Sequence, residues 1–269
     1  WGMPYAMTGM GGKHIVLRKV DGPEILRRIA EHGVTLLCGA PAVLSAVLDA
    51  AADWDGEIPG RGSMRCVVAG APPPTRTIER VETELGWEFI QIYGLTETAP
   101  LLTMNRNRSE WDDDTPAERA ARLSRAGAPA LGVTLSTAPD GELLARSNHV
   151  LKSYWDQPEA TSAALADDWF HTGDGATIDD DNFATITDRK KDVIISGGEN
   201  VSSIEVEDTL FSHPAVAEVA VIGVPDEKWG ETIKALVVLA PGAETGTNGE
   251  SVDEAALIDH CREKLAHFK

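Results

Sequence analysis

Apolar residues in the first hundred positions recur in two alternating patterns, one typical of helices and one of short buried strands. Ile25, Leu26 and Ile29 repeat at helical spacing. Asp21 before them is a suitable N-cap, and Gly33 after them is a suitable stop. The same reasoning predicts helices over residues 21–32, 41–51 and 75–85, and buried strands over residues 34–38, 64–69 and 87–92. Strands that alternate with helices in this way predict an α/β layer of mostly parallel strands, which bind ligands at their carboxyl ends.

The middle of the chain has a different pattern. Residues 105–130 are polar and predict a loop and a surface helix. Residues 131–150 predict two strands joined by a turn at Pro139-Asp140-Gly141. Residues 169–187 alternate around a polar tip, Asp179–Asn182, and predict a hairpin.

A compact second pattern follows the basic run Asp188–Asp192. Ser202 and Glu205 match a capping box at the start of a helix that continues to Leu210. Strands are predicted over residues 193–195, 215–224 and 232–239, and a last helix over residues 255–266. This α+β set of roughly 80 residues is large enough to be a domain. We therefore expect one domain at residues 1–190 and a second at residues 191–269.

Charge narrows the classes of function. Lys and Arg number 24 against 43 Asp and Glu, which gives a formal net charge of −19. Such an acidic surface repels nucleic-acid backbones and anionic lipids, so neither is expected as a partner. The apolar stretch 215–224 is too short to span a bilayer, so no transmembrane segment is expected. Arg189, Lys190 and Lys191 are the place where an anionic ligand could be held.

The three cysteines and seven histidines form no metal or disulfide pattern. Cys38 and Cys66 lie in apolar runs and are expected to be buried thiols, and Cys261 is far from both. The histidines share no metal-ligand spacing. Scattered thiols of this kind fit a reducing cytoplasm.

The hexapeptide Tyr93-Gly94-Leu95-Thr96-Glu97-Thr98 carries the clearest chemistry. It follows a predicted buried strand, on the side where ligands bind. An exposed Tyr93 offers a face to a purine, and Gly94 allows a backbone to come close. Thr96 offers a hydroxyl to a phosphate, and Glu97 a carboxylate to Mg²⁺. The alternative is a plain strand-to-helix turn with a core tyrosine.

Two further segments carry candidate residues. His171-Thr172-Gly173-Asp174 ends a predicted strand, and Asp174 could accept both hydroxyls of a ribose or could make an Asx-turn. Residues 188–207 (DRKKDVIISGGENVSSIEVE) combine charges, a strand, a glycine pair and a capped helix. The alternative for these charges is a solvated linker.

These three motifs, in this order, resemble the adenylate-forming superfamily, and in particular acyl-CoA synthetases of the AMP-binding type. The resemblance covers essentially the whole chain. It implies an α/β fold: the C-terminal part of a large domain, with a mostly parallel sheet, helices and a small β-barrel-like hairpin region, followed by a small mobile α+β domain. It also implies ATP, Mg²⁺ and CoA as cofactors or substrates.

Residue roles carry over by position from this resemblance. The resemblance implies catalytic roles for Thr96, at the α-phosphate, for Glu97, at Mg²⁺, and for Lys191, at the hinge of the small domain. It implies nucleotide binding by Gly70, Ala71, Pro72, Tyr93, Gly94, Asp174 and Arg189. It implies a CoA-binding segment at Ser196, Gly197 and Gly198, and an acyl pocket bordered by Trp1, Gly2 and Gly70.

Two lysine-bearing loops of such enzymes are not found in the sequence. Gly9–Lys13 lacks the spacing of a phosphate loop, and neither Lys264 nor Lys269 has the context of the catalytic lysine near the family's C-terminus. We therefore expect a fragment, or a chain from which segments are missing.

The resemblance implies an ATP-dependent acid–thiol ligase. It would turn a carboxylic acid, of fatty type and short to medium chain length, into acyl-AMP and then into a CoA thioester. One alternative is a ligase that loads the pantetheine of a carrier protein. Another is a nucleotide-binding relative without turnover. The expected partners are small molecules, in the cytoplasm, and a homodimer is compatible with this assignment.

Overall fold

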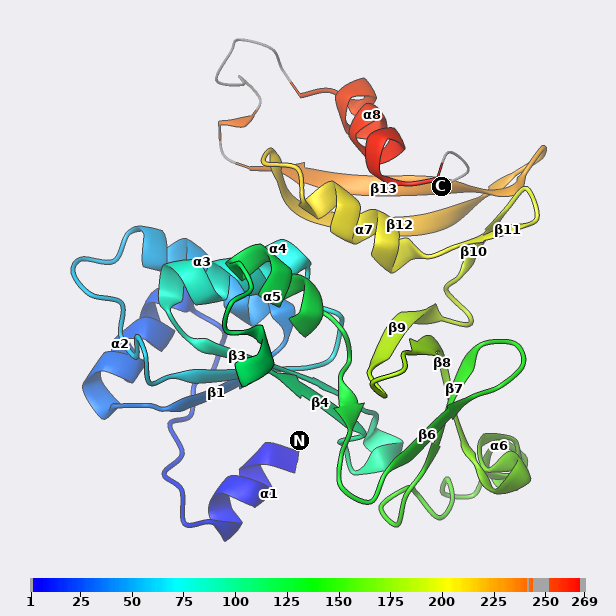
Figure 1. The fold of residues 1–269 in the computed structure, drawn as a ribbon, viewed down its shortest axis with the longest axis horizontal. Helices are drawn as coiled ribbons and strands as arrows, with labels where there is room; N and C mark the ends of the chain where they lie inside the picture. The colour runs from blue at the N-terminus through cyan, green and yellow to red at the C-terminus, as the bar shows by residue number, and fades with distance from the viewer. Residues whose placement is uncertain (1, 241, 244–251, 267–269) are drawn as a thin grey trace. The chain divides into compact units, whose positions relative to one another are not determined.

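The computed structural model describes residues 2–240, 242–243 and 252–266, and they form two compact units (Figure 1). The first unit contains the residues up to 172 together with 177–186. The second contains residues 173–176 and the residues from 187 onward. Two segments of the chain therefore lead into the second unit. The domain boundary after residue 190 stays a prediction.

A five-stranded sheet forms the centre of the first unit, in the order β1-β2-β3-β4-β5. Its strands are β1 (Leu36–Gly39), β2 (Arg65–Val68), β3 (Glu88–Tyr93), β4 (Thr103–Arg106) and β5 (Ala128–Pro129). β1, β2 and β3 run parallel, as the sequence predicted, whereas β4 is antiparallel to both of its neighbours. The prediction of a loop from residue 105 was therefore wrong at its start, where β4 continues to Arg106.

Helices pack beside this sheet, and α3, α4 and α5 lie on one face of it (Figure 1). The helices of this unit are α1 (Gly2–Gly9), α2 (Gly22–His32), α3 (Pro41–Ala52), α4 (Thr75–Arg80), α5 (Pro116–Leu123) and α6 (Pro158–Ala164). The predicted ends of α2 are confirmed, since Asp21 accepts the Glu24 N–H at 3.1 Å and Gly33 is left-handed. Leu26, Leu48 and Leu85 are fully buried in the core between these elements.

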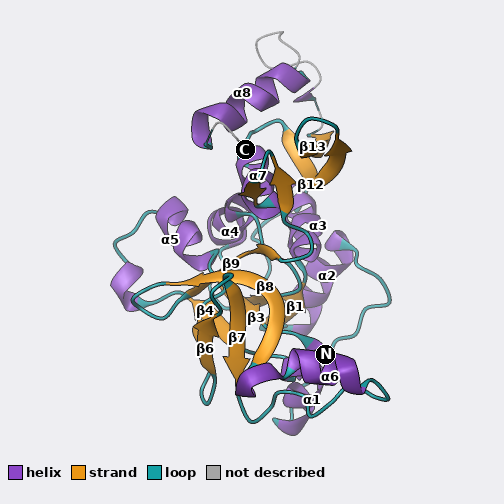
Figure 2. Cartoon of the chain, turned by 90° about the vertical axis from the view of Figure 1, so that its right-hand side faces the viewer, coloured by secondary structure: helices purple, strands orange, loops and turns teal. Residues whose placement is uncertain are grey.

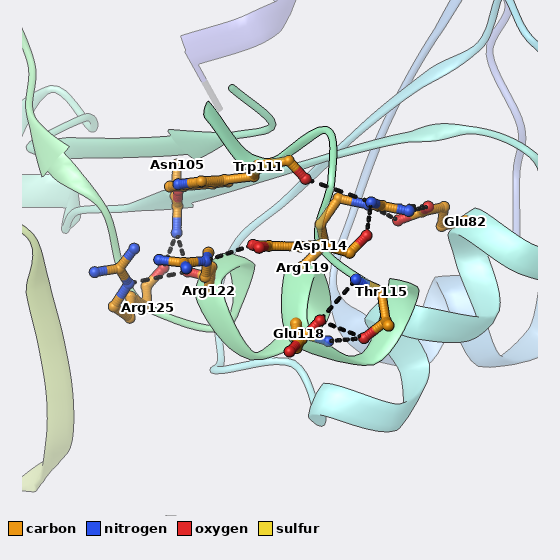
Figure 3. A network of polar contacts seen from close by, with 9 residues as sticks. All are labelled: Glu82, Asn105, Trp111, Asp114, Thr115, Glu118, Arg119, Arg122 and Arg125. Atoms are coloured by element: carbon orange, nitrogen blue, oxygen red, sulfur yellow. Dashed lines mark hydrogen bonds and ion pairs between the residues drawn. The ribbon is translucent and has the colours of Figure 1, made fainter. Parts of the chain in front are cut away.

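A network of polar contacts fixes α5 against its neighbours (Figure 3). Arg119 on α5 reaches Glu82 with its guanidinium, and Nε lies 3.1 Å from both carboxylate oxygens. At the end of the helix, the Asn105 side-chain amide of β4 donates to the carbonyls of Arg122, at 2.8 Å, and Arg125, at 3.1 Å. β4 is thereby tied to α5 through a buried polar side chain.

A second sheet, curled in Figure 2, completes the fold of the segment 134–189. Its strands are β6 (Thr134–Thr137), β7 (Glu142–Arg146), β8 (Phe170–Ile178) and β9 (Ala184–Arg189), in that order. The predicted turn at residues 139–141 and the hairpin tip at Asp179–Asn182 are both confirmed.

The second unit is an α+β structure, as predicted. Its sheet has the order β11-β10-β13-β12, with β10 (Ile194–Ser196), β11 (Glu199–Val201), β12 (Val216–Asp226) and β13 (Gly230–Leu239). α7 (Ser203–Phe211) packs on β12 and α8 (Glu254–Lys264) packs on α7. The core contains Ile194, Val206 and Leu210. Ser202 caps α7 by accepting the Glu205 N–H at 3.3 Å.

The expectation for the cysteines was half right. Cys66 is buried and burial raises the pKa of its thiol to about 12. Cys38 is exposed, because β1 is the edge strand of its sheet. No helix in the described part of the chain has the length and apolar content to cross a bilayer.

Candidate functional site

The carboxyl edge of the parallel strands carries the first group of predicted residues. β2 and β3 pair in parallel with Val68 opposite Gln91, so the loop after β2 and the end of β3 leave the sheet side by side. That loop contains Gly70, Ala71 and Pro72, all exposed, and Gly70 has a φ of +98°, which favours glycine. Tyr93, the last residue of β3, is half-buried beside the cluster of Leu102 and Phe170.

Gly94 is required by the chain's own packing. A Cβ at this position would lie 1.7 Å from the Pro100 carbonyl oxygen and 2.9 Å from the Leu102 nitrogen. The close backbone approach expected at Gly94 is thus made by the segment that returns toward β4. Gly2 also packs here, since its Cβ would lie 2.8 Å from Pro100 Cδ. Trp1, its predicted partner at the acyl pocket, lies outside the described residues.

A short 3₁₀ turn, Thr96–Thr98, presents the two predicted phosphate and metal residues. Thr98 is fully buried, and its hydroxyl accepts the Leu95 N–H at 2.9 Å and lies 3.0 Å and 2.9 Å from the carbonyls of Leu95 and Pro100. Thr96 is exposed and Glu97 half-buried. The buried threonine therefore holds the turn while its neighbours stay accessible.

Glu97 is held by a distant segment that the sequence analysis missed. The Tyr154 hydroxyl donates to Glu97 Oε1 at 3.0 Å, and the Leu151 N–H donates to the Glu97 carbonyl at 2.7 Å. His149 Nδ1 lies 2.6 Å from the Thr98 carbonyl. No motif or periodicity marks these three residues, because their relation to Glu97 arises only in the folded chain.

The side chains of this turn suit Mg²⁺ that is bound partly by substrate phosphates, and not a metal ion whose ligands all come from the protein. Among the residues that the structure describes, no group of three or more His, Cys, Asp or Glu side chains is arranged to hold a metal ion. Mg²⁺ is commonly bound by one or two carboxylates together with substrate phosphates and water. A single accessible carboxylate such as Glu97 suits that coordination.

The second unit brings Asp174 and Arg189 together. Arg189 Nε lies 3.8 Å from Asp174 Oδ1, and the backbones join through the Lys190 N–H and the Gly173 carbonyl at 2.9 Å. Asp174 is buried and Arg189 is exposed. The Asx-turn alternative for Asp174 is wrong, because this residue lies within strand β8.

Lys191 lies in an exposed turn directly after β9. The N–H groups of Asp192 and Val193 donate to the Arg189 carbonyl at 2.9 Å and 3.1 Å. Before the turn, the buried Asp188 accepts the backbone N–H of Ser203 at 2.8 Å. The start of α7 is thereby attached to the end of β9 across the turn.

Ser196, Gly197 and Gly198 belong to the β10–β11 hairpin, a strand pair that the sequence analysis did not predict. Gly197 and Gly198 have φ values of +60° and +86°, as a two-residue hairpin turn requires. A Cβ on Gly197 would lie 2.9 Å from the Trp229 ring, whereas one on Gly198 would meet nothing within 4 Å. Each unit thus carries its own group of predicted site residues.

Comparison with known families decides the identity of this arrangement. A model described as AMP-binding enzyme matches residues 1–155, and one described as AMP-binding enzyme C-terminal domain matches residues 205–269. The chain belongs to the AMP-binding enzyme family. The predicted fold class and family resemblance are both confirmed.

Curated relatives in this family include CoA ligases. The chain is 39% identical over 286 residues to 2-methylpropanoate–CoA ligase CCL4 of Humulus lupulus, matching 100% of this chain and 49% of that protein. It is 37% identical over 282 residues to a probable peroxisomal acyl-activating enzyme 5 of Arabidopsis thaliana, with 100% and 49% covered. The chain spans about half the length of the curated relatives it matches.

Solved structures agree with the fold. ATP-bound MatB from Rhodopseudomonas palustris matches with a TM-score of 0.80 at 29% identity, over 99% of this chain and 51% of that one. O-succinylbenzoate coenzyme A synthetase (MenE) from Bacillus subtilis, in complex with ATP and magnesium ion, matches with a TM-score of 0.76 at 28% identity, over 98% and 52%.

Proposed function

We propose that this chain is part of an ATP-dependent acid–thiol ligase. The enzyme joins a carboxylic acid to AMP with release of pyrophosphate, and then transfers the acyl group to CoA. The observation that carries the proposal is the family match over both units, with an accessible Thr96 and Glu97 at the carboxyl edge of the sheet.

The adenylation step is assigned to the residues for which the family resemblance implies nucleotide or metal binding. Tyr93 offers its ring to adenine, and Gly70, Ala71, Pro72 and Gly94 border the nucleotide. Thr96 donates to the α-phosphate and Glu97 holds Mg²⁺. Asp174 and Arg189 bind the ribose hydroxyls, which their 3.8 Å separation supports because both groups can reach one small diol. When bound, Mg²⁺ neutralises phosphate charge and polarises the phosphoryl oxygen.

The thioester step is assigned to the second unit. Ser196, Gly197 and Gly198 border the pantetheine arm of CoA, and their exposed hairpin turn supports this because a narrow chain can pass along glycines without steric conflict. Lys191 is the pivot that exchanges the groups presented to the adenylate between the two half-reactions. Its place in an exposed turn between two strands supports this role.

We infer a short- to medium-chain acid as the substrate, with Trp1, Gly2 and Gly70 at the acyl pocket. A relative named as a 2-methylpropanoate–CoA ligase supports a small aliphatic acid. We assign the enzyme to the cytoplasm, which the scattered cysteines of the sequence support because they form no disulfide pattern. Because one relative is described as peroxisomal, a localisation experiment has to distinguish the cytoplasm from the peroxisome.

The test is product analysis with the full-length protein. ATP, Mg²⁺, CoA and 2-methylpropanoate or hexanoate should give AMP, pyrophosphate and the acyl-CoA in equal amounts, measured by liquid chromatography. Nucleotide binding without AMP release would overturn the proposal. Thioester formed only on a pantetheinylated carrier protein would overturn the assignment of CoA as acceptor. The 269-residue chain alone should be inactive, because the family's two phosphate-facing lysine loops are not found in it.

A further inference from the structure

We propose that Tyr154 is a positioning residue for Glu97, and that its hydroxyl fixes one carboxylate oxygen so that the other is available to the cation. The proposal rests on the proposed function, which makes Glu97 the metal-binding carboxylate. The direct observation is the hydrogen bond of 3.0 Å from the Tyr154 hydroxyl to Glu97 Oε1. Among the described residues, no hydrogen bond or ion pair is recorded at Oε2.

The backbones of the two segments are joined as well as their side chains. The Leu151 N–H donates to the Glu97 carbonyl at 2.7 Å, and His149 Nδ1 contacts the Thr98 carbonyl at 2.6 Å. Residues 149–154 therefore contact the 3₁₀ turn through three hydrogen bonds, although more than fifty positions separate the two segments in the sequence. A contact supported in this way is a property of the fold and not of one free side chain.

Tyr154 is itself held through its backbone. Its backbone N–H donates to Thr161 Oγ1 at 3.0 Å, and that hydroxyl donates to the Gln157 carbonyl at 2.8 Å, in the first turn of α6. The backbone of Tyr154 is thus attached to α6 while its hydroxyl contacts Glu97. Burial, together with the nearby Glu97 carboxylate, raises the pKa of Tyr154 above its ordinary value near 10, so the hydroxyl stays a donor at neutral pH.

A fixed carboxylate matters for this cation in particular. Mg²⁺ demands near-ideal octahedral geometry with short bonds, and a glutamate side chain with three free torsions must be ordered to satisfy it. Hydrogen-bond partners of metal-binding side chains supply that order, and their removal typically costs ~10–100-fold in metal affinity. A neutral phenol does so without cancelling the negative charge that the cation needs.

The test compares Tyr154→Phe with the neighbouring control Trp155→Phe in the full-length enzyme. Trp155 is 91% exposed and makes no hydrogen bond to any other described residue, so its variant should behave as the wild type. Mn²⁺ binding in the presence of a non-hydrolysable ATP analogue is measured by electron paramagnetic resonance. We expect Tyr154→Phe to weaken Mn²⁺ binding ~10-fold or more, with the KM for the acid unchanged.

Unchanged Mn²⁺ affinity in Tyr154→Phe would overturn the inference while the wild type stays active. A wild-type enzyme that binds no Mn²⁺–nucleotide would instead overturn the proposed function.

Discussion

The two units each carry a glycine-bearing segment among their predicted site residues, and the two segments are built in opposite ways. In the first unit, Gly94 is pressed against the Pro100 backbone and the adjoining turn is tied by a fully buried threonine, Thr98. In the second, Gly197 and Gly198 form the exposed end of a two-residue hairpin. Gly94 is needed because there is no space for a side chain at its position, whereas Gly198 is needed only for its backbone angle.

This contrast matches the two half-reactions of the proposed function. Adenylation needs a metal-binding carboxylate and a hydroxyl held still against charged phosphates, which favours a pinned turn. Thioester formation needs a narrow chain to pass and a different set of groups to be presented, which favours an exposed turn beside a pivot.

The largest effect is expected for Gly94→Ala. The added methyl group would lie 1.7 Å from the Pro100 carbonyl oxygen, so the backbone at residue 94 and the backbone of residues 100–102 must move apart. We expect a loss of about 3 kcal/mol or more in the free energy of unfolding, measured by urea denaturation. The matched control is Gly9→Ala, where a Cβ meets nothing within 4 Å, and its unfolding should be unchanged within about 0.5 kcal/mol. Equal stability of the two variants would remove the basis of the comparison.

Thr98→Val should have the next largest effect. The change keeps the volume but removes the buried hydroxyl, leaving the Leu95 N–H without its partner. An unsatisfied buried donor costs about 1–3 kcal/mol, again visible in urea denaturation. Thr96→Val, on the same turn but exposed, should change stability little. If the two valine variants unfold alike, Thr98 does not hold the turn.

A smaller effect is expected in the second unit from Gly198→Ala. Its Cβ would have open space, so the cost comes only from the φ of +86°, about 1 kcal/mol. Gly197→Ala should cost more, because its Cβ would also meet the Trp229 ring at 2.9 Å. Thermal unfolding of the two variants gives the order, and the reverse order would contradict this description of the turn.

The smallest expected effect is a pH dependence in the second unit. Burial raises the pKa of Glu207, whose Oε1 accepts the Val221 N–H at 2.8 Å. The folded protein therefore binds this proton more tightly than the unfolded chain, so its stabilising contribution is present at low pH. It is lost as the pH rises from the ordinary pKa of 4.5 through the raised one.

Glu207→Gln cannot ionise, so it should not lose stability over this pH range, and its side-chain oxygen can still accept the Val221 N–H. Relative to the wild type, the variant should gain stability between pH 4 and pH 7, by less than about 1 kcal/mol. Exposed Glu227→Gln is the control and should show no such trend. The comparison is made by urea denaturation at several pH values. A Glu207→Gln variant that becomes less stable than the wild type as the pH rises would refute the prediction.

Local signals in the sequence predicted much of this fold because the side chains that make them act on nearby backbone. Asp21 caps α2 and Ser202 caps α7, each through a hydrogen bond three residues away. Strand β4 was not predicted, since its buried Thr103 and Asn105 are polar and donate to distant carbonyls at residues 122–126. Alternation of apolar and polar residues cannot reveal such a strand.

The candidate site shows the same limit. The residue types at Thr96, Glu97 and Asp174 suggested their chemistry, and the resemblance of the three motifs supplied the family. The contact of Tyr154 with Glu97 could not be predicted, because it depends on how a loop 57 positions later lies on the turn. The partner of Gly94 was equally hidden, since a glycine in a sequence does not show which backbone approaches it.

The most direct test of the account is to measure both half-reactions in two variants of the full-length enzyme. Glu97→Gln should lower ATP–pyrophosphate exchange ~100-fold or more, because the carboxylate proposed to bind the metal is lost, and thioester formation should fall with it. Lys191→Pro fixes φ and removes an N–H at the proposed pivot, so acyl-CoA yield should fall while exchange is largely kept. Equal loss of both half-reactions in Lys191→Pro, or of neither, would contradict the assignment of Lys191 as the pivot between them.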